Sequence, residues 1–386
     1  MKPILSTLVA NREKLRSLRE RILANAVMFG EIPAPTFGEK RRVRFLCDRF
    51  EESELQNISS DEAGNGIAVM PGTERGKRSI LVVAHTDTVF ASGIDHTVKV
   101  EVDRLEGPGI ADNSLGLAVV ASLPSVFESL GITLKSDLVF LGVSQSNGRG
   151  NLAGLRFFLD NCSIPLSAGV CVEGVHLGRL SYSCLGMLRA EITCHAPVDA
   201  EWDTSAGVSA IANMTKILTR ILAIPTPQVP RTSIILGSVN SGTAFNTLAT
   251  NATLQLEVRS EEAGAVRKIR EAIAEMLEEV SAETGTRNEM EIIARRYPGG
   301  IGFSHPLVRG TRQIMEELKI RPKIAPSVGE LSALIAHGIP AVTLGITKGD
   351  NCHEFTEYVE IDPIFGGISQ LVGVLQAIDE GVCDED

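Results

Sequence analysis

The sequence contains no Cys-x-x-Cys pair, the spacing at which two thiolates commonly share a zinc ion. Its seven cysteines are scattered and odd in number, so they do not suggest a disulfide framework either. We expect free thiols in a reducing compartment. Cys352, directly before His353, is the one cysteine beside a candidate metal ligand, and we expect nitrogen and oxygen ligands in its place.

A long apolar stretch is also missing near the amino terminus, where the chain soon turns polar. The sequence therefore predicts neither a signal peptide nor a membrane span. An excess of positive charge is missing too: 37 Lys and Arg stand against 48 Asp and Glu, for a net charge of -11. This balance argues against nucleic acid or an anionic membrane as the main partner. We expect a cytoplasmic protein.

The composition that is present is that of a globular protein, with 44% hydrophobic and 22% charged residues among 386. Short apolar runs, such as residues 79–84, 138–143 and 168–172, alternate with amphipathic stretches. This alternation predicts an α/β fold, with a mostly parallel sheet and helices on both of its faces.

The pattern changes at residue 187. Residues 187–297 follow the order strand, helix, strand, strand, helix, strand, which is typical of an α+β ferredoxin-like domain. We interpret this segment as an insertion. The first domain is then discontinuous and consists of residues 1–186 and 298–386.

His85 and Asp87 stand at the carboxyl end of the buried strand predicted over residues 79–84. Open α/β sheets bind their ligands at this end of the strands. A neutral imidazole can bind a metal ion, and a carboxylate two residues further on can orient the ring. A hydrogen-bonded polar pair at a strand end has the same pattern, so these two residues alone leave both interpretations open.

Further motifs follow in order along nearly the whole chain. They are His85-Thr-Asp-Thr-Val, Gly107-Pro-Gly-Ile-Ala-Asp112-Asn, Gly142 to Gly154, Glu173-Gly, Gly242-x-x-x-Asn246, Val258-Arg259 and His353-x-x-x-Glu357-Tyr-Val. This series resembles the co-catalytic zinc peptidases and amidohydrolases, the family of peptidase T, glutamate carboxypeptidase, aminoacylase and acetylornithine deacetylase. The peptidase T-like branch is the most similar.

The resemblance implies a site in which two zinc ions share one aspartate. It places that bridge at Asp112, one ion on His85 and Glu173, and the other on His353 and a glutamate after the fourth strand. It also implies that the inserted segment is a lid and dimerisation domain. Asn246 and Arg259 match positions that contact a substrate carboxylate.

Three positions depart from the family pattern. Ser146 stands where the family has its general base, Asn147 stands where it has a metal ligand, and Ala200 stands where it has an oxyanion-binding histidine. No Asp or Glu occurs between Asp137 and Asp160 to replace the missing pair. Neither a serine hydroxyl nor an amide is a usable general base by itself.

Three functions remain open. The first is an impaired or inactive relative of the zinc hydrolases, which holds at most one zinc ion and a small carboxylate-bearing peptide or N-acyl amino acid. The second is an active hydrolase with a non-standard base. The third is a non-enzymatic dimeric binding or assembly module. For all three, the resemblance implies a homodimer formed through the inserted domain.

Overall fold

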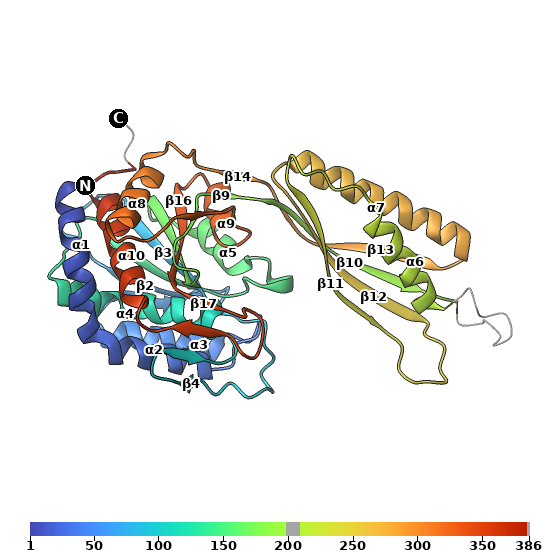
Figure 1. Cartoon of the computed structure of the whole chain (residues 1–386), viewed down its shortest axis with the longest axis horizontal. Helices are drawn as coiled ribbons and strands as arrows, with labels where there is room; N and C mark the ends of the chain where they lie inside the picture. The colour runs from blue at the N-terminus through green and yellow to red at the C-terminus, as the bar shows by residue number, and fades with distance from the viewer. Residues whose placement is uncertain (198–208, 384–386) are drawn as a thin grey trace. The chain divides into compact units, whose positions relative to one another are not determined.

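A computed structural model describes residues 1–197 and 209–383 of the chain (Figure 1). The chain divides into two compact units, the first formed by Met1–Ser183 and Gly300–Asp386 and the second by Cys184–Gly299. The insertion predicted over residues 187–297 falls inside the second unit. The strands β9 (Ser183–Cys184) and β14 (Gly299–Gly300) lie where the chain passes between the units.

The first unit is built on an eight-stranded sheet with the order β1-β2-β6-β3-β7-β16-β8-β15. These strands are β1 (Gln56–Ser60), β2 (Gly66–Met70), β3 (Ser79–His85), β6 (Leu138–Val143), β7 (Leu166–Val175), β8 (Arg179–Ser181), β15 (Lys323–Ile324) and β16 (Ala341–Thr347). The four central strands β6, β3, β7 and β16 are parallel, and antiparallel pairings occur toward both edges. The predicted α/β class is confirmed, with a mixed rather than uniformly parallel sheet.

Helices cover both faces of this sheet. They are α1 (Lys2–Lys14), α2 (Arg19–Glu31), α3 (Lys40–Glu52), α4 (Leu115–Leu130), α5 (Ala153–Asn161), α8 (Pro306–Glu317), α9 (Leu331–Ala336) and α10 (Ile364–Asp379). Alternate residues of β3 point to opposite faces: Ile80 and Val82 join the core that includes α1, α2, α4 and α10, whereas Leu81 and Val83 join the core that includes α5 and α9. Burial on both sides explains why this strand is a continuous apolar run.

The parallel arrangement brings four chain segments to one edge of the sheet. His85 is the last residue of β3, Glu173 lies near the end of β7, and β6 and β16 run on into loops that carry Ser146 and His353. A smaller sheet, with the order β17-β18-β5-β4, holds the last of these loops. Its strands are β4 (Lys99–Val100), β5 (Arg104–Glu106), β17 (Gly349–Asp350) and β18 (Tyr358–Glu360).

The segment that ends in α4 is strongly apolar. Residues Ile110–Leu130 are long and apolar enough to cross a membrane, but 94% of the most apolar part is buried inside the protein. Such burial is the pattern of a core helix, because a helix that is hydrophobic all round must be covered by neighbours. Asp112 sits at the start of this segment, two residues after Ile110.

The second unit has the ferredoxin-like order that the sequence predicts. Its elements are β10 (Gly186–His195), α6 (Ala210–Leu222), β11 (Thr232–Ser241), β12 (Asn251–Ser260), α7 (Ala263–Thr284) and β13 (Arg287–Arg296). The antiparallel sheet has the order β11-β12-β10-β13. Both helices pack into a core with apolar residues of this sheet, among them Ile192 and Leu254.

Close packing of α10 on β16 gives a first prediction. A Cβ atom at Gly367 would lie 1.9 Å from the carbonyl oxygen of Ile346, a backbone atom that cannot move aside alone. We expect Gly367→Ala to lower the free energy of unfolding by at least about 2 kcal/mol. Urea unfolding followed by circular dichroism measures this change.

Gly264→Ala is the matched control, because a Cβ at Gly264 in α7 meets no atom within 4 Å. Alanine has a higher helix propensity than glycine, so this change should be neutral or stabilising by up to about 1 kcal/mol. Equal unfolding free energies for the two variants would contradict the packing seen between α10 and β16.

Candidate metal centre

His85 is buried at the end of β3, with only 5% of its surface exposed. Its Nδ1 lies 2.9 Å from the main-chain oxygen of Asp87, so Nδ1 carries the donating proton of the neutral ring. Its Nε2 lies 2.8 Å from Oδ1 of Asp112. The backbone contact therefore leaves Nε2 as the ring atom that can bind a metal ion.

Asp112 lies between two histidines. Its Oδ1 faces His85, and its Oδ2 lies 2.9 Å from Nε2 of His353, which belongs to the loop after β16. One carboxylate thus offers an oxygen to each ring from opposite sides. This is the arrangement that the sequence resemblance implies for a bridging aspartate, although the role of a bridge itself stays a prediction.

Glu173 completes a group of three side chains that could hold a metal ion. One ligand atom from each of His85, Asp112 and Glu173 can be chosen so that all three lie within 4.8 Å of one another. Ligand atoms about 2 Å from one zinc ion lie up to about 4 Å apart, so the group is close to the required size. Within residues 1–197 and 209–383, no other three His, Cys, Asp or Glu side chains form such a group, and Cys352 is not part of it.

The charges around this group also fit a cation. Asp112, Glu173 and the buried Glu330 are three carboxylates within electrostatic reach of His85, and Arg179 lies 3.7 Å from Glu173. With a neutral imidazole, this set carries three negative charges and one positive charge. The buried carboxylate of Asp87, 3.4 Å from Nδ1 of His85, adds a further negative charge, so the surroundings of the ligand group favour a cation.

Asp87 supports His85 through its backbone and through its carboxylate. Its Oδ1 lies 3.4 Å from Nδ1 of His85, beyond ordinary hydrogen-bond distance, and so the main-chain oxygen makes the closer contact. Its Oδ2 accepts hydrogen bonds from Thr36 Oγ1 at 2.7 Å and from the backbone N–H of Asn147 at 2.8 Å. Asp87 thereby ties the loop after β6 to the histidine.

Glu357 braces the other side of the site. This fully buried carboxylate accepts backbone hydrogen bonds from His353 at 2.7 Å, Ala111 at 3.0 Å and Asp112 at 3.3 Å. Burial, aided by the charge of Asp112 and opposed by these N–H groups, raises the pKa of Glu357 to about 7. The motif His353-x-x-x-Glu357 therefore holds the backbone of Asp112 and of His353 through one carboxylate.

The loop after β6 supplies no carboxylate to this site. The Ser146 hydroxyl and the Asn147 Nδ2 are both buried without a hydrogen-bond partner in the structure. Glu39 holds the neighbouring Gln145 through its backbone N–H at 2.8 Å, so the loop is anchored in this position. On the side of Asp112 that faces His353, the predicted ligand set therefore consists of Asp112 and His353 alone.

The predicted substrate contacts lie in the second unit. Arg259 in β12 forms an ion pair with Glu257, which also pairs with Arg189 at 2.6 Å. Asn246 lies exposed in the loop between β11 and β12. Ala200 is outside the described residues. The roles of Asn246 and Arg259 in substrate contact, and of Ala200 as the replacement of an oxyanion-binding histidine, stay predictions.

Arg42 and Arg179 belong to the site's surroundings but are not evident from the sequence. Arg42, within the run Lys40-Arg-Arg that reads as solvated surface, is fully buried and donates to the main-chain oxygens of Ile32 and Thr86. Burial lowers the pKa of Arg42 to about 10. Arg179 follows β7 by four residues, and no local signal pairs it with Glu173.

The titration of His85 and Glu173 predicts a pH dependence of metal affinity. Burial opposes a charge on His85, but Asp112 outweighs it and raises the pKa of His85 well above its usual value. Burial, opposed by Arg179 and aided by Asp112, raises the pKa of Glu173 to about 7. A bound metal ion must displace these protons, so zinc affinity should rise about tenfold per pH unit for each proton released.

Titration with a chromophoric zinc chelator from pH 6 to pH 8 measures this slope. The metal-free protein should show the opposite trend in stability. Because both folded-state pKa values are raised, the folded state binds more protons than the unfolded state, and stability falls as pH rises through this range. A zinc affinity that does not change with pH would contradict the assignment of these two side chains as ligands.

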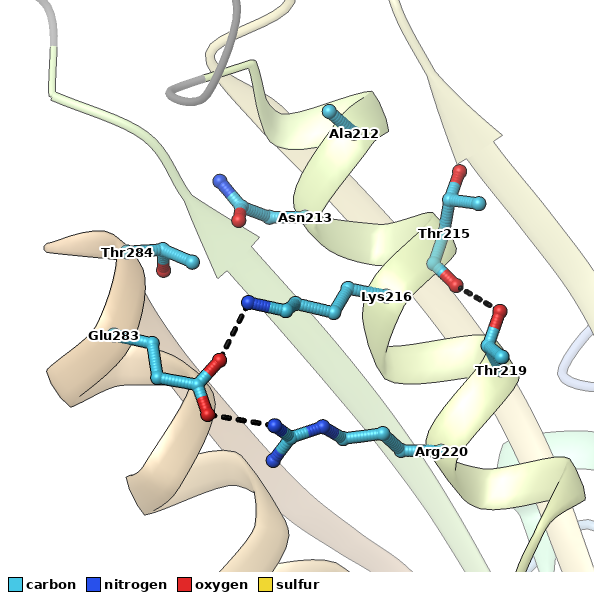
Figure 2. A pocket seen from close by; sticks show the side chains of 8 residues that line it. All are labelled: Ala212, Asn213, Thr215, Lys216, Thr219, Arg220, Glu283 and Thr284. Carbon is cyan, nitrogen blue, oxygen red and sulfur yellow. Dashed lines mark hydrogen bonds and ion pairs between the residues drawn. The ribbon is translucent and has the colours of Figure 1, made fainter.

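The second unit contains an open groove between α6 and α7 (Figure 2). Lys216 and Arg220 on α6 both point to the carboxylate of Glu283 on α7, with ion-pair distances of 2.5 Å and 2.6 Å. The two cations are thus already paired. We do not assign this groove a part in the metal chemistry.

The fold and the ligand group define a metallopeptidase-like domain, and residues 81–377 match the model of peptidase family M20/M25/M40. The chain belongs to this family. The uncharacterized protein YqjE of Bacillus subtilis (strain 168) is 25% identical over 363 residues, which cover 87% of this chain and 91% of that protein. The predicted family is therefore confirmed, and with it a hydrolase-type fold.

Solved structures share this fold at low sequence identity. A tripeptidase of Staphylococcus aureus has a TM-score of 0.74 at 19% identity, covering 94% of this chain and 99% of that one. The Bacillus subtilis YXEP protein, described as a dinuclear metal-binding peptidase of family M20, has a TM-score of 0.65 at 16% identity, covering 95% and 99%. These likenesses extend over both units of the chain.

Proposed function

We propose that this protein binds one zinc ion through His85, Asp112 and Glu173, and that it holds a small peptide or N-acyl amino acid without hydrolysing it at the rate of its active relatives. The observation that carries the proposal is the loop after β6, where Ser146 and Asn147 stand in place of a base and a ligand. Zinc bound here would polarise a carbonyl oxygen or acidify a water molecule. The chain's own residues must still accept a proton, and neither of these two side chains does so readily.

The ligand group supports a metal ion, and the charge balance supports a single one. The two nearest carboxylates, Asp112 and Glu173, match the charge of one divalent cation. A second ion beside His353 would add two positive charges where residues 146 and 147 contribute none. Zinc also prefers anionic oxygen, nitrogen or sulfur to an amide oxygen, so Asn147 is a poor substitute for glutamate.

The test combines metal content with turnover. We expect the zinc-loaded and desalted protein to contain about one zinc ion per chain, measured by inductively coupled plasma mass spectrometry. We also expect no measurable hydrolysis of dipeptides or of N-acyl amino acids. Two zinc ions per chain, together with turnover that His85→Ala abolishes, would reject the proposal. That outcome would favour the second candidate, an active hydrolase whose base comes from elsewhere in the site.

We also propose that the second unit mediates a homodimer in the cytoplasm. The edge strand β11 supports the homodimer. It is ten residues long and exposes Ile235 and Val239, and no strand of the described part of the chain pairs with its outer edge. Such an edge is a template for pairing with another chain. Analytical ultracentrifugation of the whole chain tests it. Sedimentation as a monomer at micromolar concentration, or unchanged sedimentation of a variant with Ile235→Lys, would argue against β11 as the interface.

A further inference from the structure

Glu330 is a buried carboxylate that the functions above do not use. It directly precedes α9, and only 5% of its surface is exposed. Among the described residues, no N–H or O–H donates to its carboxylate, and no Lys, Arg or His forms an ion pair with it. Solvent can still reach its oxygens, whereas the Ser146 hydroxyl is sealed from solvent. A carboxylate that no protein group donates to, and whose oxygens solvent can reach, is suited to a donor that arrives with a ligand and takes the place of water.

The loop that carries Glu330 lies against the metal ligands. A Cβ atom at Gly329, the preceding residue, would be 4.0 Å from Oε1 of Glu173. Glu330 is also close enough to act electrostatically on both Glu173 and His85. Within the loop, the Gly329 N–H donates a hydrogen bond to the Ser327 hydroxyl at 3.0 Å. Glu330 thus stands in the same wall of the site as Glu173.

The other charges near Glu330 already have partners. Arg179 lies 3.7 Å from Glu173, and Asp112 contacts both histidines. A metal ion at the ligand group would be neutralised by Asp112 and Glu173. Glu330 is therefore the carboxylate left without a partner once the ion is in place, and its natural partner is a positive group on the ligand.

We propose that Glu330 receives the protonated amino group of the bound ligand, so that the site selects amino acids and peptides with a free amine over N-acylated ones. This inference rests on the proposed one-metal, ligand-holding site and narrows its ligand class. A charge-assisted hydrogen bond in a largely buried position is strong enough to decide between the two classes. An N-acyl group would leave Glu330 buried and unpaired beside a neutral amide.

The experiment is isothermal titration of the zinc-loaded protein with L-leucylglycine and with N-acetyl-L-leucylglycine. We expect the free amine to bind about 10- to 100-fold more tightly than the acetylated form. In Glu330→Gln this preference should shrink to within about threefold, through weaker binding of the free dipeptide only. Glu354→Gln removes the same charge at an exposed position next to His353 and should keep the preference.

Two outcomes of the peptide titrations would overturn the inference about Glu330. Equal binding of the two peptides by the wild-type protein overturns the inference without any variant. A Glu330→Gln variant that keeps its zinc ion and its preference overturns it as well. Zinc content is measured on every sample, so a protein that never holds zinc, or one that hydrolyses the free dipeptide, counts against the proposed function and is recognised before selectivity is compared.

Discussion

The Ser146→Glu/Asn147→Glu variant is expected to hold two zinc ions per chain where the wild-type protein holds one. The two new carboxylates would supply an anionic oxygen on the side of Asp112 that faces His353, which now has no anionic ligand besides the shared carboxylate. They would also balance the charge of a second divalent ion. Metal content after zinc loading and desalting measures the change.

A variant with glutamine at both positions is the matched control, because it has nearly the same size and no added charge. It should stay at one zinc ion per chain. In the absence of metal, the glutamate variant should be less stable than the wild-type protein by several kcal/mol, since two buried charges join Asp87 and Asp112. Zinc should restore that stability by mass action, and a variant that gains neither metal nor zinc-dependent stability would refute the assignment of the loop.

Hydrolysis is not expected to return with these two glutamates alone. The sequence resemblance implies that Ala200 takes the place of a histidine that stabilises the oxyanion, a role that stays a prediction. Loss of one oxyanion donor costs about 3 to 4 kcal/mol of transition-state stabilisation in other hydrolases, which is a factor of about 10² to 10³ in rate. Full turnover by the double variant would show that Ala200 is not at a catalytic position.

His85→Ala should have the second largest effect, a loss of zinc affinity of at least about 100-fold. The substitution removes the one nitrogen ligand of the group and leaves two carboxylates from different elements to hold the ion. Competition with a chromophoric zinc chelator at pH 7.5 measures the dissociation constants of both proteins.

His337→Ala is the control for this variant. His337 follows α9, pairs with Asp160 on the surface and lies outside the ligand group, so its removal should leave zinc affinity within about twofold of the wild type. If the two histidine variants bound zinc equally well, the ion would have to be held by other side chains.

Sequence patterns were sufficient for the parts of the molecule that depend on local periodicity. The continuous apolar run of β3 and the order of strands and helices after residue 187 predict the sheet and the ferredoxin-like unit that the structure contains. The strands at the sheet edges were less predictable. The antiparallel pairing of β2 with β6 and of β8 with β16 depends on contacts between distant segments, which periodicity does not encode.

His85 could be named from the sequence because it stands at the end of a buried strand, and the family resemblance then implied the other candidate ligands. His85, Asp112, Glu173 and His353 come together in the structure through the parallel strands and the segment before α4. Their supporting groups could not be named in this way. Arg42 reads as part of a charged surface run and is fully buried, because its guanidinium satisfies carbonyl groups that only the folded chain brings within reach.

The family, the two-part organisation and the absence of carboxylates in the loop after β6 can all be found without a structure, since each depends on which residue types follow one another along the chain. Which carboxylates lack a partner became evident from the folded chain alone. Glu330 and Glu357 are both buried acids, but three backbone N–H groups reach Glu357 and none of the described ones reaches the side chain of Glu330. Burial and pairing are set by segments far apart in sequence, and they separate a structural carboxylate from one that is open to a ligand.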